Sequence, residues 1–146
     1  MRVTVLNGPN LNLLGSREPE VYGRATLDQV ESLVRTEAAH LGVAIEWFQS
    51  NHEGALIDQI QALPGRSEGL VLNAGAYTHT SVAIRDALLA VRIPFVEVHL
   101  SNIFARAEIR RHSVFGDLAL GVIAGFGPQS YLLGLRALTA RLTNAS

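Results

Sequence analysis

Residues 69–99, GLVLNAGAYTHTSVAIRDALLAVRIPFVEVH, contain the pattern that decides the fold. Gly69–Asn73 and Pro94–His99 are short apolar runs of the kind found in buried strands. Thr80–Val91 lies between them and is predicted to be a helix. A strand, a helix and a second strand in this order predict two parallel strands joined by a right-handed crossover.

The same alternation extends in both directions from this unit. Thr26 and Gln29 have the spacing of a capping box, as do Ser50 and Glu53, and each pair indicates the start of a helix. The remaining helices are expected from Thr26 to about Gly42, from Ser50 to Pro64–Gly65, at Ile103–Arg111 and at Gln129–Leu142. The remaining strands are expected at Val3–Leu6, Val43–Phe48 and Leu118–Phe126.

Five apolar strands that alternate with helices predict an α/β protein whose parallel sheet is covered on both faces. Such a three-layer sandwich with right-handed crossovers favours a flavodoxin-like strand order, 2-1-3-4-5. No linker, repeat or low-complexity stretch interrupts the pattern. We therefore expect residues 1–146 to form a single domain.

The composition excludes several kinds of chemistry. The chain has no cysteine, which rules out disulfides, thiolate nucleophiles and cysteine-ligated zinc. All 12 basic residues are arginines, so no lysine can form a Schiff base. A formal net charge of −1 indicates no basic surface for nucleic acid or an acidic membrane. No apolar run is long enough to span a membrane and no leader pattern is visible, so we expect a cytoplasmic protein.

Polar side chains gather where the expected strands end, and three of the five histidines are among them. In a sheet of this order, ligands bind outside the carboxyl ends of the strands, where the strand order reverses. We therefore predict a site at this edge. Its candidate residues are Asn7, Asn10, His52, Asn73, His79, His99 and Ser101.

Glu97 and His99 form the most specific pair at this edge. They are two residues apart in a strand, so their side chains face the same side. A carboxylate that orients an imidazole fixes its tautomer and raises its basicity, as acid–base catalysis requires. The alternative is a histidine at the edge of the core with a local hydrogen bond. The chain has neither a cysteine pair nor histidines at helical ligand spacing, so we expect no metal.

Three further polar or charged features near this edge each have two interpretations. Ser101 precedes the expected short helix, whose first N–H groups would bind an anion or donate to an ordinary N-cap side chain. Arg106 and Arg110 would share one face of that helix, as an anion-binding pair or as a solvated surface. Asp86 interrupts an apolar helix, so it would face solvent or reach into the site of a partner chain.

Arg17 and Tyr22 lie in an unusually long connection after the first strand, and such connections are commonly functional or disordered. Tyrosine becomes a base at neutral pH only if its phenolate is stabilised by roughly 4 kcal/mol. A neighbouring arginine is the simplest source of that stabilisation. Arg17 would therefore hold Tyr22 as a tyrosinate, unless Tyr22 is simply a surface residue of a loop.

Five blocks in this order resemble type II 3-dehydroquinate dehydratases over nearly the whole chain. They are LNGPNLNLLGSREPEVYG (6–23), QSNHEGALID (49–58), LNAGAYTHTSVAIRDAL (72–88), PFVEVHLSNIFARAEIRRHS (94–113) and GVIAGFGPQSYLLGLRAL (121–138). The resemblance implies a flavodoxin-like fold and the conversion of 3-dehydroquinate to 3-dehydroshikimate in the shikimate pathway, without cofactor or metal. Phe48 departs from the family, which commonly has arginine there, and this leaves local packing or a subunit contact in question.

The resemblance also implies a role for each site residue. Tyr22 would be the base, stabilised by Arg17, in a lid at about residues 15–24. Asn10 would hold a water that stabilises the enolate. His99, oriented by Glu97, would be the acid.

The substrate is expected to be held by a second group of residues, and the resemblance implies a homo-oligomer, a dodecamer built from trimers. Asp86 would come from a neighbouring subunit. The other substrate-binding residues would be Asn73, His79, Leu100, Ser101 and Arg110.

Three rival functions differ from this interpretation in the residues that they require. A flavin-binding protein of this fold needs Ser and Thr in its first loop, and residues 7–15 contain neither. A phospho-receiver domain needs an acidic cluster after the first strand and a later lysine, which are both missing. A catalytically dead scaffold, or a binder of quinate-like acids, is hard to reconcile with the presence of Arg17, Tyr22 and His99, and an activity assay would distinguish it from an enzyme.

Overall fold

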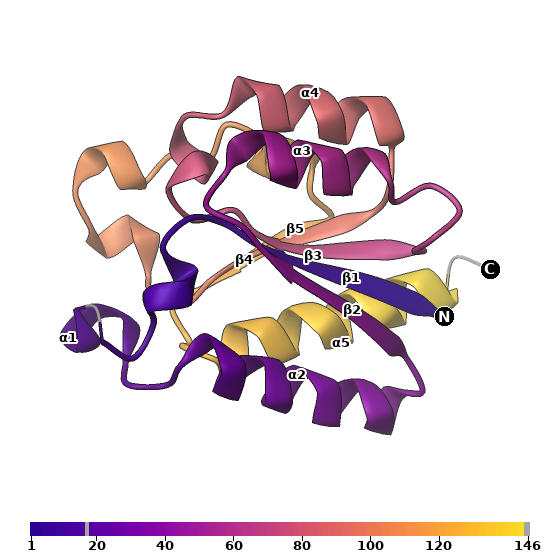
Figure 1. Ribbon diagram of the computed structural model, residues 1–146, viewed down its shortest axis with the longest axis horizontal. Coiled ribbons are helices and arrows are strands. Elements are labelled where there is room, and N and C mark those ends of the chain that lie inside the picture. The colour runs from indigo at the N-terminus through magenta and orange to yellow at the C-terminus, as the bar shows by residue number, and fades with distance from the viewer. Residues whose placement is uncertain (17, 145–146) are drawn as a thin grey trace.

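The protein contains one sheet of five parallel strands in the order β2-β1-β3-β4-β5 (Figure 1). The structure is a computed structural model that describes residues 1–16 and 18–144, without the side chain of Tyr22. The strands are β1 (Arg2–Asn7), β2 (Ala44–Gln49), β3 (Gly69–Asn73), β4 (Phe95–His99) and β5 (Gly121–Ala124). The predicted fold class and strand order are confirmed.

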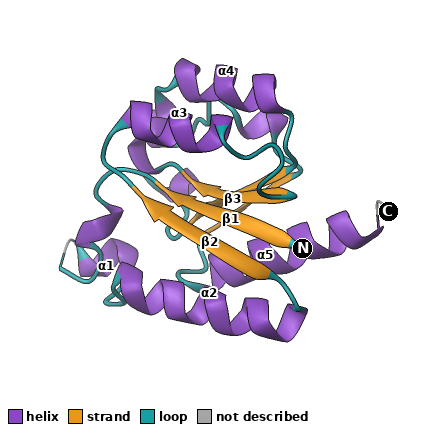
Figure 2. Ribbon diagram, turned by 45° about the vertical axis from the view of Figure 1, so that its right-hand side comes forward, coloured by secondary structure: helices purple, strands orange, loops and turns teal. Residues whose placement is uncertain are grey.

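Helices cover both faces of the sheet and make the molecule a three-layer sandwich (Figures 1 and 2). One layer holds α2 (Leu27–Leu41) and α5 (Gln129–Asn144), and the opposite layer holds α3 (Glu53–Gln61) and α4 (Val82–Val91). A short helix, α1 (Pro19–Tyr22), precedes α2. None of the helices in the described ranges is long and apolar enough to cross a membrane.

The core consists of two apolar clusters, one on each face of the sheet. Alternating residues of one strand enter different clusters, as Val71 and Leu72 of β3 show. Both are buried, which explains why the strand is apolar on both faces. Phe48 packs against the cluster on the α3 and α4 side, so this departure from the family pattern takes part in local packing.

One of the two predicted capping boxes is confirmed and the other is wrong. Thr26 Oγ1 accepts a hydrogen bond from the Gln29 N–H, and the Gln29 side chain accepts one from the Thr26 N–H. At α3 the N-cap is His52, not Ser50. The carboxylate of Glu53 instead accepts a hydrogen bond from Ser81 Oγ, a side chain of the next helical unit.

The segment between β4 and β5 also differs from the expectation. Two separate 3₁₀ turns, Ile103–Ala105 and Glu108–Arg110, replace the predicted helix at 103–111, because Arg106 between them is extended. The last strand is shorter than predicted, since Gly116–Leu118 forms a further 3₁₀ turn before β5.

Candidate active site

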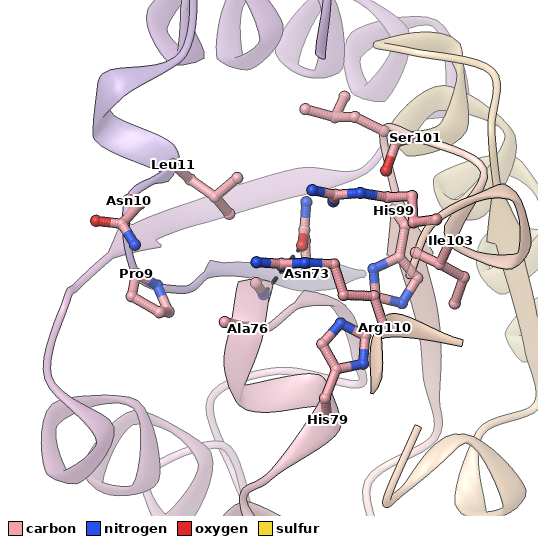
Figure 3. A pocket seen from close by; sticks show the side chains of 13 residues that line it. Pro9, Asn10, Leu11, Asn73, Ala76, His79, His99, Ser101, Ile103 and Arg110 are labelled. Atoms are coloured by element: carbon pink, nitrogen blue, oxygen red, sulfur yellow. Dashed lines mark hydrogen bonds between the residues drawn. The ribbon is translucent and has the colours of Figure 1, made fainter. Parts of the chain in front are cut away.

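A pocket of about 120 Å³ lies at the edge of the sheet where β1, β3 and β4 end (Figure 3). Its walls come from the loops that follow these three strands. The lining residues are Pro9, Asn10, Leu11, Asn73, Gly75, Ala76, His79, His99, Leu100, Ser101, Ile103, Arg106 and Arg110. The pocket therefore occupies the predicted position at the carboxyl ends of the strands.

His99, the last residue of β4, is bound to a buried carboxylate. Its Nε2 lies 2.7 Å from Glu97 Oε2, and Glu97 is fully buried. The other carboxylate oxygen, Oε1, accepts a hydrogen bond of 2.7 Å from Ser113 Oγ. Both oxygens thus have donors, so the Glu97 carboxylate is fixed and keeps Nδ1 of His99 as the nitrogen available to a ligand.

His79 is oriented by the backbone carbonyl of His112, the residue next to Ser113. Its Nδ1 lies 2.7 Å from the carbonyl oxygen of His112, which only accepts, so Nδ1 carries the proton. Partial burial lowers the pKa of His79, and the nearby His99 and Arg110 lower it further. Nε2 of the neutral ring is then a hydrogen-bond acceptor for a ligand.

Asn73, at the end of β3, belongs to a buried hydrogen-bond network. Its Oδ1 accepts a hydrogen bond of 3.2 Å from the N–H of Gly75, and its Nδ2 donates one of 2.8 Å to the hydroxyl of Tyr131. That hydroxyl in turn donates to Asn7 Oδ1 at 2.7 Å. The amide of Asn73 is therefore held in one orientation at the pocket.

The pocket wall is positively charged. Arg106 and Arg110 both line it, although Arg106 lies between the two 3₁₀ turns and Arg110 ends the second, so they do not share one helix. Within residues 1–16 and 18–144, none of the residues that line the pocket is acidic, and the carboxylate of Glu97 is bound to His99 without lining the pocket. The pocket therefore favours an anionic ligand such as a carboxylate.

Most predicted site residues within the described ranges meet at this pocket. Asn10 has a left-handed backbone, and its N–H donates to Asn51 Oδ1 at 3.0 Å. Asp86 is exposed on α4 and is not among the lining residues, and neither is His52. Arg17 and the side chain of Tyr22 lie outside the described part of the structure.

Sequence patterns missed the residues that support the two histidines. Ser113 and the His112 carbonyl approach the site because the backbone at Val114 docks on Thr78, with an N–H···O distance of 2.9 Å. Tyr131 was also missed, since its hydroxyl is part of the buried face of α5. These contacts depend on tertiary docking, and local sequence carries no signal for them.

In residues 1–16 and 18–144, no three or more His, Cys, Asp or Glu side chains are grouped so that they could hold a metal ion.

Comparisons with known proteins agree with this fold. A 3-dehydroquinate dehydratase of Azorhizobium caulinodans is 62% identical over 93% of this chain and 92% of its own length. A catabolic 3-dehydroquinase of Aspergillus terreus is 58% identical over 88% of this chain and 85% of its own. The crystal structure of type II dehydroquinase from Butyrivibrio crossotus superimposes with a TM-score of 0.92 at 42% identity, covering 94% of this chain and 97% of that one. The family described as Dehydroquinase class II matches residues 1–139, and the chain therefore belongs to this family.

Proposed function

We propose that this protein is a hydro-lyase that removes water from 3-dehydroquinate to give 3-dehydroshikimate. The observation that supports this best is the Glu97–His99 pair at the end of β4, beside two arginines in one pocket. An acid next to an anion-binding wall suits a substrate that carries a carboxylate and a leaving hydroxyl. The similar proteins named 3-dehydroquinate dehydratase support the same substrate.

The first step is removal of a proton from the carbon next to the ketone. We assign the base to Tyr22, held as a phenolate by Arg17. The electron pair of the broken C–H bond moves onto the ketone oxygen and forms an enolate. A water molecule held by Asn10, which lines the pocket, stabilises that oxygen by hydrogen bonding.

The second step is departure of the hydroxyl group β to the ketone. The enolate oxygen re-forms the ketone C=O, the electron pair of the enolate C=C becomes the new C=C bond, and the C–O bond breaks with its electron pair on the departing oxygen. His99, as an imidazolium, donates its Nδ1 proton to the departing oxygen, which leaves as water. Glu97 stabilises the imidazolium through Nε2, at 2.7 Å. Base and acid act from opposite sides of the ring, which makes the elimination anti.

Several pocket residues hold the substrate. Asn73 and the backbone at Leu100 and Ser101 bind the carboxylate. His79 accepts a hydrogen bond from a ring hydroxyl through Nε2, and Arg110 donates to another. These three side chains and the two backbone positions belong to residues that line the same pocket as His99.

A loop at about residues 15–24 is proposed to close as a lid over the substrate. It bears both Arg17 and Tyr22, so closure completes the site and excludes water. The lid belongs to a single catalytic domain that spans residues 1–146. The cytoplasmic location expected from the sequence stays a prediction.

Asp86 is proposed to act in a neighbouring subunit of a dodecamer built from trimers. Val82, Asp86 and Leu89 are spaced so that they share one face of α4. The two apolar residues are 59% and 48% exposed, and burial against a partner would cover both of them.

The proposed metabolic role is aromatic amino acid biosynthesis, while one similar relative is named a catabolic 3-dehydroquinase. A deletion strain that fails to grow without aromatic amino acids would support biosynthesis. Growth of that strain, together with loss of growth on quinate, would assign the protein to quinate breakdown.

The activity is tested by adding purified protein to 3-dehydroquinate and following the ultraviolet absorbance of the conjugated product. Wild-type protein should form 3-dehydroshikimate, and Tyr22→Phe should lower kcat at least about a hundredfold. Wild-type protein that binds quinate but forms no product would instead identify a binding protein.

A further inference from the structure

We infer that Tyr131 is a positioning residue that sets the orientation of the Asn73 amide at the substrate pocket. This inference rests on the proposed function, in which Asn73 binds the substrate carboxylate. Tyr131 lies on α5, on the opposite side of the sheet from α3 and α4, and is fully buried. It does not line the pocket, so any effect on the substrate passes through Asn73.

The hydrogen-bond network has one consistent direction, which begins at a backbone carbonyl. The Phe48 carbonyl can only accept, and it receives a hydrogen bond of 3.2 Å from Asn7 Nδ2. The amide oxygen of Asn7 therefore faces Tyr131. Because that oxygen also only accepts, the Tyr131 hydroxyl must donate its single proton to it, at 2.7 Å.

The same logic continues into the pocket. With its proton given to Asn7, the Tyr131 oxygen can only accept from the other side. Asn73 must then present Nδ2 to it, at 2.8 Å, and direct Oδ1 to the N–H of Gly75. One N–H of Asn73 remains for a ligand, which makes this position a donor that suits a carboxylate.

The surroundings of Tyr131 keep this arrangement rigid. Its ring packs against Trp47 with a centroid distance of 6.0 Å, and it belongs to the apolar cluster under α2 and α5. Asn7 and Asn73 are register partners on adjacent strands, so one hydroxyl reaches both amides. Burial raises the pKa of Tyr131, which keeps the hydroxyl protonated as the network requires.

The test compares two tyrosine-to-phenylalanine variants that each lose one hydrogen-bonded hydroxyl. Tyr131→Phe keeps the ring and its packing but frees the Asn73 amide to rotate. Tyr77→Phe is the matched control, since that hydroxyl bonds the Asn51 carbonyl and Tyr77 does not line the pocket. The KM for 3-dehydroquinate should rise about three- to tenfold in Tyr131→Phe, the range for one hydrogen bond, and kcat should fall less.

Two further variants separate positioning from a general loss of stability. Asn7→Ala removes the acceptor at the far end of the network and should also raise KM, although Asn7 does not line the pocket. In an Asn73→Ala background, Tyr131→Phe should change KM no further, because the group that it positions is gone. Thermal melting of every variant ensures that each is assayed while folded.

Three results would overturn the inference: an unchanged KM in Tyr131→Phe, an equal rise in Tyr77→Phe, or a full additional rise in the Asn73→Ala background. Calorimetric binding of quinate, which keeps the carboxylate and has no ketone to react, repeats the comparison without turnover. Inactive wild-type protein that binds quinate more tightly than Tyr131→Phe does would contradict the proposed reaction and leave the positioning role supported.

Discussion

Among single residues, Glu97 connects two side chains that lie far apart in the sequence. Its carboxylate accepts from Ser113 Oγ at 2.7 Å and is bound to His99 Nε2 at 2.7 Å. The pair Glu97–His99 was predictable because strand periodicity alone places i and i+2 on one face. Ser113 was not, because its approach depends on how residues 112–116 dock against the loop after β3.

The first prediction concerns Ser113. Ser113→Ala removes a neutral donor from a buried carboxylate, so Glu97 loses one of the bonds that fix it. We expect kcat to fall about tenfold, the range for a hydrogen bond to a charged group, with KM little changed. Steady-state kinetics measures this, and Ser32→Ala is the control, since that hydroxyl bonds the Asp28 carbonyl on the surface of α2. An unchanged kcat would contradict the idea that Ser113 supports the Glu97–His99 pair.

The second prediction concerns the ionisation of His79. Its pKa should lie below the ordinary 6.5, because burial and neighbouring positive charges disfavour the imidazolium. NMR titration of the ring protons, assigned with His79→Asn, measures it. A pKa at or above 6.5 would contradict the acceptor role of Nε2.

The same shift determines how stability depends on pH. Between the lowered pKa and 6.5, the unfolded chain binds a proton that folded His79 does not. The contribution of neutral His79 to the free energy of unfolding is therefore complete above about pH 6.5, and it is lost as the pH falls through the lowered pKa. Urea unfolding across this range should show a smaller loss of stability in His79→Asn than in the wild type.

Among the elements, two capping patterns with the same spacing had different outcomes, since only one of them forms a capping box. Thr26 caps α2 as predicted, whereas Glu53 binds Ser81 of the next helical unit and leaves the N-cap of α3 to His52. The sequence around a helix start reveals its local cap, but not a competitor from another element. The helix predicted at 103–111 was wrong for a similar reason, since Arg106 and Arg110 line a pocket that local sequence does not show.

The third prediction concerns the close approach of the loops after β1 and β3. The Gly8 N–H donates to the Asn73 carbonyl at 2.8 Å, and a Cβ on Gly8 would lie 2.2 Å from the Ala74 carbonyl oxygen. Gly8→Ala should lower the free energy of unfolding by at least about 1–3 kcal/mol, since backbone must move. Urea unfolding measures it. Gly54→Ala, where a Cβ meets nothing within 4 Å, should be neutral or stabilising, and equal effects would contradict the argument.

For the whole molecule, the strand order was predictable from alternation and handedness, and the position of the site followed from that order. The position of Asp86 relative to the pocket did not follow from the strand order. It is exposed on α4, and the pocket residues of its own chain do not include it. A residue that is proposed to act in the site of a second chain cannot be placed from the topology of one chain.

The fourth prediction tests this assembly by complementation. Asp86→Ala and Tyr22→Phe chains, unfolded and refolded together, should form some sites that contain both wild-type residues. Activity should then exceed that of either variant refolded alone, as measured by product absorbance. Absence of rescue in a mixture of full oligomer size would exclude a role for Asp86 in a neighbouring site, and an active monomer in light scattering would exclude the dodecamer.

The most direct test of the central claim is to separate the base from the acid by hydrogen exchange. With 3-dehydroquinate in D₂O, His99→Ala should exchange the proton next to the ketone while it forms no 3-dehydroshikimate, because Tyr22 still generates the enolate. Tyr22→Phe should give neither exchange nor product above its residual rate. NMR measures the exchange and ultraviolet absorbance the product. Loss of both in a folded His99→Ala protein, or normal turnover in Tyr22→Phe, would contradict the proposed division of roles.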